Sequence, residues 1–192
     1  MKKTTRYLND IVQSQVIAAI SSEDKLDVAI RSESNVAFLL TGDIMVLPSY
    51  VERLKSTGMH VFVHLDFIDG LANDKSAIDY IAKQVKPTGI ITTKSFLIKL
   101  AKKQNLLTIQ RLFIIDRNAV QKGITMTKDS QPDAIEVLPG IIPKVIHQFL
   151  ESSKLPIIAG GLVDREQEVH EALEAGVLAV STGEADLWNL GV

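Results

Sequence analysis

The sequence predicts an α/β protein folded as a compact (β/α)8 TIM barrel with parallel strands and shortened helices. Short apolar runs recur at nearly even spacing, longer amphipathic stretches separate them, and each run ends in a polar or small residue. This alternation of strand and helix signals indicates parallel strands joined by crossovers. An open doubly wound sheet is the other architecture that fits, but eight evenly spaced units favour the closed barrel. Such barrels usually need ~250 residues, so a chain of 192 residues must have trimmed loops and short helices.

The predicted strands are short and mostly rich in β-branched residues. In chain order they are Val16–Ile20, Val36–Leu40, Val61–Leu65, Gly89–Ile91, Leu112–Ile115, Ala134–Val137, Pro156–Ala159 and Leu178–Val180. Their starts lie about 20 to 30 residues apart, close to a minimal β/α unit. No linker divides the chain, so we expect residues 1–192 to form a single β/α-barrel domain.

Helix signals fill the spaces between these runs. Asn73-Asp74 precedes a stretch with helical spacing of apolar residues, and Ser95 is placed to cap a helix over 96–104. Pro143 suits the first turn of a helix that reaches Leu150, because its missing amide hydrogen costs little there. Asp164 is expected to cap a helix over 165–175, which Gly176 would end.

Composition excludes several classes of protein. The chain has no cysteine, which rules out disulfides, thiolate metal sites and a cysteine nucleophile. No apolar signal core follows the basic first residues, and no apolar run approaches the roughly 20 residues that cross a bilayer. The protein is therefore expected to be cytoplasmic.

Charge is distributed unevenly along the chain. The net charge of -2 argues by itself against a nucleic-acid partner. Between Lys83 and Lys128, however, ten cations accompany a single acid, Asp116, which gives this stretch +9 and leaves -11 for the rest. Sign segregation of this size requires an explanation, and a solvated cationic face is the alternative to a binding surface.

Two turns after the last predicted strands suggest a phosphate site. Gly160-Gly161 follows the seventh strand, where the backbone must approach a ligand closely or adopt positive φ. Ser181-Thr182-Gly183 follows the eighth strand and opens a short helix whose free amides, with the two hydroxyls, can bind an anion. Phosphate binding by the loops after strands seven and eight recurs in such barrels.

Other polar residues are expected at the same end of the barrel. Alternation turns His64 and Asp66 toward the barrel axis, and Glu136 faces inward on the sixth strand. Lys94 follows the fourth strand. Together with Asp116, the histidine and the acids allow a metal-dependent or acid–base sugar-phosphate isomerase or epimerase of the phosphate-binding barrel class. Lys94 could instead serve as a Schiff-base lysine. No spacing among these residues specifies a metal or a reaction, so no catalytic residue, metal ligand or cofactor is assigned.

Several segments resemble the glycerol-3-phosphate-responsive antiterminators of bacterial glycerol operons. The segments are Asp133 to Ile146, Ile157 to Leu162, Ala172 to Gly176, Ala179 to Thr182, Leu187-Trp188, His64-Leu-Asp66 and Gly89 to Lys94. The resemblance spans essentially the whole chain and matches Gly183-Glu184-Ala185 least well. It implies a regulator rather than an enzyme, with glycerol 3-phosphate as effector and the leader mRNA of a glycerol operon as partner, which promotes read-through of a terminator.

This resemblance gives the two unusual features separate roles. Gly160, Gly161, Ser181, Thr182 and Gly183 would hold the effector phosphate, and His64, Asp66, Lys94 and Glu136 are candidates for its remaining polar contacts. The basic stretch would bind RNA phosphates through Lys99, Lys102, Lys103, Lys122 and Lys128. Phe96 and Phe113 are expected in the core, so the sequence shows no platform for stacking bases. The oligomeric state stays open, a homo-oligomer included, as does the alternative of a binding-inactive barrel that serves as a protein adaptor.

Overall fold

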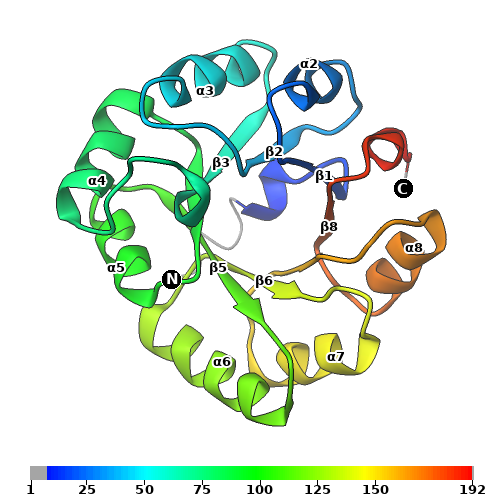
Figure 1. Ribbon diagram of the computed structural model, residues 1–192. Coiled ribbons are helices and arrows are strands. Elements are labelled where there is room, and N and C mark those ends of the chain that lie inside the picture. The colour runs from blue at the N-terminus through cyan, green and yellow to red at the C-terminus, as the bar shows by residue number, and fades with distance from the viewer. Residues whose placement is uncertain (1–7, 192) are drawn as a thin grey trace.

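Eight parallel strands close into a barrel in the structure, a computed structural model that describes residues 8–191. The strands follow one another around the barrel in chain order, and pairing of the eighth with the first closes it. Viewed along the axis, the helices form a ring around the strands (Figure 1). The predicted (β/α)8 TIM barrel is therefore confirmed.

Each strand is short, as a barrel from so short a chain requires. The strands are β1 (Val16–Ile20), β2 (Val36–Leu39), β3 (His60–His64), β4 (Gly89–Thr92), β5 (Leu107–Phe113), β6 (Ala134–Leu138), β7 (Ile157–Gly160) and β8 (Ala179–Thr182). In strands this short, the inward side chains stack in only a few layers, so the residues at the strand ends already lie at the barrel mouth.

The helices that follow are also short. They are α2 (Lys25–Ile30), α3 (Leu47–Lys55), α4 (Lys75–Tyr80), α5 (Ser95–Lys103), α6 (Arg117–Ser130), α7 (Pro143–Ser152) and α8 (Glu166–Glu174), with a 3-10 turn η1 (Leu65–Phe67), a π-helical turn η2 (Ile81–Val85) and a 3-10 turn η3 (Ala185–Asn189). Asp74 and Asp116 cap α4 and α6 by accepting bonds from backbone amides at 2.9 and 2.7 Å. Within residues 8–191, no helix has the length and apolar character that a membrane crossing requires.

The core has two layers because inward and outward side chains alternate along each strand. Ile17, Phe38, Phe62 and Ile109 belong to the cluster inside the barrel. A second cluster lies between the strands and the helices, and it contains Val61, Val63, Ile135 and Val137 among others. The predicted facing of β3 and β6 is thus confirmed, because their valines and Ile135 pack outward.

Four local expectations were wrong. Ser95 does not cap the helix after β4, because α5 begins at Ser95 itself and the Ser95 hydroxyl makes no hydrogen bond within residues 8–191. The fifth strand begins at Leu107 rather than Leu112. The prediction missed its first half because the polar residues Thr108 and Gln110 interrupt the apolar run. Both lie on the outward side of the strand, where the Thr108 hydroxyl donates to buried Asp133. Phe96 and Phe113 are not in the core but 49% and 55% exposed. The start of α8 is held by Glu168, whose carboxylate accepts from the amides of Asp164 and Arg165, rather than by an Asp164 side-chain cap.

Candidate functional site

A cavity of about 220 Å³ opens at the mouth of the barrel, where the carboxyl ends of the strands meet. Its lining comes from β1, β2, β5, β6, β7 and β8: Ala19, Ser21, Leu40, Arg111, Glu136, Leu138, Gly161, Leu162, Val163, Ser181, Thr182 and Gly183. Functional residues in such barrels gather at this end. The predicted turns after β7 and β8 are therefore brought together around one space.

A buried ion pair forms the floor of this cavity. Arg111 on β5 donates from Nε and Nη2 to the two carboxylate oxygens of Glu136 on β6, at 2.6 and 3.1 Å. Ser181 Oγ donates to Glu136 Oε1 at 2.7 Å. Because a guanidinium carries five N–H donors, Arg111 keeps donors for a ligand after these two bonds. Glu136 was predicted as a candidate ligand contact. In the structure both of its carboxylate oxygens bind Arg111 and so fix the orientation of the guanidinium.

The two predicted glycines have different roles. Gly160 ends β7, and a Cβ at this position would lie 2.5 Å from Ser181 Oγ and 2.7 Å from Glu136 Oε1. Gly160 therefore makes room for the buried polar cluster. Gly161 follows at φ +72, a conformation that side chains disfavour, and it lines the cavity.

Hydroxyls and amides at the end of β8 are used differently from the expectation. Thr182 Oγ1 donates to the Val163 carbonyl at 2.7 Å, and Ser181 is bound to Glu136, so both hydroxyls have partners within the chain. The amides of Gly161, Leu162 and Gly183 make no hydrogen bond within residues 8–191. Free amide donors are thus the groups that this part of the cavity offers to an anion.

Lys25 adds a positive charge beside the same turn. Its Nζ donates to the carbonyl oxygen of Gly183 at 2.7 Å, although 158 residues separate the two in sequence. Sequence reasoning missed Lys25 because no local pattern distinguishes it from other helix lysines.

Three further predicted residues form a second cluster on the β3–β4 side of the mouth. Asp66 pairs with Lys94 Nζ and accepts from the Thr93 amide at 2.8 Å. Burial raises the pKa of the Asp66 carboxyl, but the bonds from Lys94 and Thr93 outweigh burial and hold the pKa below its ordinary value. His64 Nδ1 lies 3.8 Å from Asp66 Oδ2. None of these three residues lines the cavity above Arg111.

His64 is a buried histidine without a hydrogen-bond partner. Neither ring nitrogen is bonded within the described chain, and the residue is 0% exposed. Burial and the nearby Arg111 guanidinium lower its pKa to about 3, so the imidazole is neutral near pH 7. A neutral imidazole offers one donor and one acceptor, which suits a hydroxyl-bearing ligand.

The residues considered for a metal-dependent enzyme do not gather into one group. Asp116 caps α6, and both carboxylate oxygens of Glu136 accept hydrogen bonds from Arg111. Within residues 8–191, no cluster of three or more histidine, aspartate or glutamate residues is placed to hold a metal ion.

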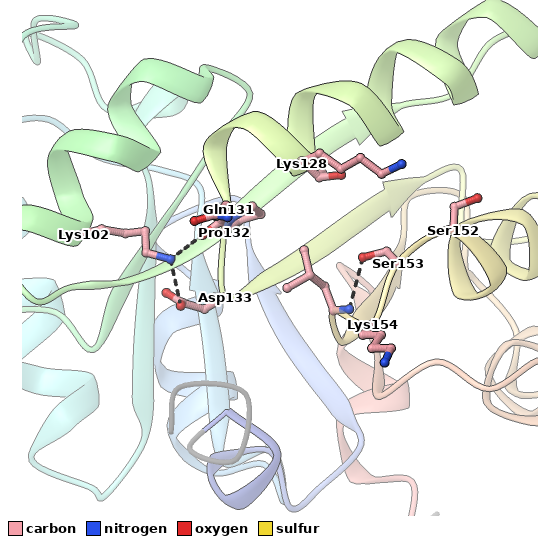
Figure 2. A pocket seen from close by; sticks show the side chains of 10 residues that line it. Lys102, Lys128, Gln131, Pro132, Asp133, Ser152, Ser153 and Lys154 are labelled. Carbon is pink, nitrogen blue, oxygen red and sulfur yellow. Dashed lines mark hydrogen bonds and ion pairs between the residues drawn. The ribbon is translucent and has the colours of Figure 1, made fainter. Parts of the chain in front are cut away.

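The predicted RNA-contacting lysines lie on the outer helices α5 and α6. Lys102 is exposed, and its Nζ pairs with the Gln131 carbonyl and lies 3.6 Å from buried Asp133 (Figure 2). Lys102 and Lys128 both line a pocket at the amino-terminal end of the barrel, which is the pocket drawn in Figure 2. Lys99 lies 3.9 Å from Asp129, and Lys103 and Lys122 are exposed. These lysines thus share one side of the barrel, several of them toward the end opposite the mouth.

Arg111 was the main omission of the sequence reasoning, which counted it among the cations of the basic stretch. The run from Leu107 to Phe113 alternates, and Ile109 and Arg111 share its inward face. A strand that began at Leu107 would have placed Arg111 in the barrel, opposite Glu136 in the register of β5 and β6.

Comparison with known proteins identifies the family. The model of the family described as glycerol-3-phosphate responsive antiterminator matches residues 16–188. The chain belongs to this family. A member of the Escherichia coli (strain K12) proteome, the uncharacterized protein YgcP, is 36% identical over 178 residues, which cover 93% of each chain.

Solved structures agree with the antiterminator family. The glycerol uptake operon antiterminator regulatory protein of Listeria monocytogenes is 34% identical, with a TM-score of 0.87 over 90% of this chain and 94% of that one. A glycerol uptake operon antiterminator-related protein of Thermotoga maritima is 36% identical, with a TM-score of 0.81 over 90% and 96%. Aldolases and an epimerase at 12–14% identity share the barrel fold, and that likeness shows the fold alone.

Proposed function

We propose that this antiterminator-family protein binds glycerol 3-phosphate at the barrel mouth and then binds the leader mRNA of a glycerol operon in the cytoplasm, which promotes read-through of a terminator. Family membership supports a regulatory role. The observation that carries the effector assignment is the mouth cavity, where the unbonded amides of Gly161, Leu162 and Gly183 share one space with Arg111.

The chemistry of this cavity fits a small phosphorylated polyol. Backbone amides aimed at one point bind a phosphate without a dedicated lysine, and Arg111 can donate to phosphate or hydroxyl oxygens with the donors that Glu136 leaves free. Ser181 and Thr182 line the same cavity, and Gly160 leaves room for the contact between Ser181 and Glu136. His64, Asp66 and Lys94 stay candidates for ligand contacts from the neighbouring cluster.

Calorimetric titration with glycerol 3-phosphate tests the effector site. We expect wild type to bind, and Gly161→Asp to lose binding because the new carboxylate adds negative charge and strain at a positive φ. Gly191→Ala is the matched control, since a Cβ there meets nothing within 4 Å. Equal binding by wild type and Gly161→Asp contradicts the site. Titrations with glycerol and with inorganic phosphate separate the contributions of the two ends of the ligand.

An affinity measurement over a salt series tests the RNA surface. Replacing Lys99, Lys102 and Lys103 by Glu removes three cations, so the slope of log affinity against log salt should fall by up to about 2 for single-stranded leader RNA. Lys75→Glu on α4 is the control for net charge. A slope that the triple variant leaves unchanged places the phosphate contacts elsewhere.

A further inference from the structure

The six phenylalanines of this protein fall into two sharply different groups. Phe38, Phe62 and Phe149 are fully buried. Phe67, Phe96 and Phe113 are 48%, 49% and 55% exposed. Exposing half of a phenylalanine gives up a large part of its hydrophobic stabilisation, so three such residues on one surface indicate a binding role.

All three exposed rings lie at the mouth. Phe67 follows β3, Phe96 is in the first turn of α5 after β4, and Phe113 ends β5. These strands are consecutive neighbours in the barrel. Of the large hydrophobic residues exposed within residues 8–191, every one except Val28 lies at the carboxyl end of a strand or in the segment just after it: Ile44, Met45, Phe67, Phe96, Phe113, Ile115, Ile141, Ile142 and Leu162.

Cations border this aromatic sector. Arg117 and Lys144 line a cavity of about 220 Å³ together with Ile115 and Ile142, just beyond Phe113. Neither cation forms an ion pair with an acid within residues 8–191. The one acid of that cavity, Asp116, has an oxygen committed to the Ala119 amide. The surface therefore places unpaired positive charge beside the Phe113 end of the row of exposed rings.

We propose that Phe67, Phe96 and Phe113 form a stacking surface for unpaired bases of RNA, with Arg117 and Lys144 contacting the adjoining phosphates. Aromatic faces recognise splayed bases, and cations track the backbone between them. The unpaired cations beside the rings favour a polyanion over a second protein copy as the occupant of this surface. This inference rests on the proposed function and places base recognition at the mouth, whereas the α5 and α6 lysines lie outside it.

Phe67 connects this surface to the effector cavity. Its ring packs edge-on against His64, with the centroids 4.6 Å apart, and the Arg111 guanidinium carbon lies 6.0 Å from the Phe67 centroid. A ligand that engages Arg111 or His64 would therefore fix the position of one of the three rings. Effector binding would then favour the Phe67 position that stacks a base, and the two binding events would be coupled through this side chain.

The test uses RNA selected from a random-sequence single-stranded pool on the wild-type protein in saturating glycerol 3-phosphate, then measured by fluorescence anisotropy. Phe96→Ala and Phe113→Ala should each weaken binding by between about 5-fold and 100-fold. Phe113→Leu should lose affinity as well, while Phe113→Trp should retain it, because only tryptophan keeps an aromatic face. Met45→Ala, exposed on the β2 side of the mouth, is the control. Thermal melts establish that the variants fold.

The outcomes separate this inference from the proposed function. Loss in the alanine and leucine variants with retention in the tryptophan variant supports the stacking surface. Selected RNA that binds all phenylalanine variants equally overturns it but leaves RNA binding intact. Failure of wild type to select any RNA contradicts the proposed function itself, and the stacking surface with it. Sedimentation in which the variants dissociate an oligomer with unchanged RNA affinity assigns the rings to self-association and likewise overturns the inference.

Discussion

Substitutions in the buried pair of Arg111 and Glu136 are predicted to affect stability and ligand binding differently. The two side chains are 6% and 0% exposed, and two hydrogen bonds join them. Removing one partner leaves the other charged and buried, which costs about 3–5 kcal/mol. At roughly 2–4 °C per kcal/mol for a chain of this size, Glu136→Leu or Arg111→Met should lower the melting temperature by about 6–20 °C.

The double variant Arg111→Met with Glu136→Leu should recover most of that loss. No charge is left unpaired, and apolar pairs of similar volume often match or exceed a buried ion pair in stability. Ser181 loses its acceptor in this variant, which leaves a residual cost of about 1 kcal/mol. Calorimetry on the refolded double variant should nevertheless show loss of glycerol 3-phosphate binding, because the guanidinium is gone.

Urea unfolding of the four proteins measures the coupling energy of the cycle, and the reasoning fails in either of two ways. Single variants that cost under 1 kcal/mol would show that the pair is not effectively buried. A stable double variant that binds glycerol 3-phosphate like wild type would remove Arg111 from the ligand site.

Three further predictions follow from neighbouring residues. His64 has a pKa lowered to about 3 from an ordinary 6.5, so its contribution to stability is present above about pH 6.5 and is lost as the pH falls toward 3. Between pH 6.5 and pH 5, urea unfolding should show wild type losing about 1.6 kcal/mol more than His64→Leu, and parallel losses would argue against a buried neutral imidazole. Gly160→Ala should cost about 1–3 kcal/mol, since its Cβ would overlap Ser181 Oγ and Glu136 Oε1, whereas Gly191→Ala should leave the melting temperature unchanged. Lys94→Met should raise the pKa of Asp66, because its hydrogen-bonded cation is removed. A carboxyl titration by NMR that stays in place would refute the pairing.

The barrel could be predicted from the sequence because strand-length apolar runs and intervening amphipathic stretches are local patterns. Facing was predictable where alternation was clean, as on β3 and β6. The start of β5 was not, because Thr108 and Gln110 are polar residues on an outward face, where a local pattern looks like a loop. Thr108 is satisfied there by Asp133, a partner 25 residues away.

The position of the candidate site at the barrel mouth could be predicted from the sequence, but its internal contacts could not. Glycines after two strands led to the prediction of a ligand site there, and the structure gathers those turns around one cavity. Two of its contacts depend on packing between segments that are distant in the sequence. Gly160 makes room for the Ser181–Glu136 contact, and Lys25 donates to the Gly183 carbonyl. Phe96 and Phe113 were assigned to the core by their residue type, and only three-dimensional placement shows them at the mouth.

A crystal structure of the protein grown with glycerol 3-phosphate tests the central claim most directly. Our account predicts phosphate density within hydrogen-bond distance of the Gly161 and Gly183 amides, with a ligand oxygen on Arg111. Density for the ligand at another surface, or an empty mouth in crystals of a protein that binds it in solution, would contradict the assignment.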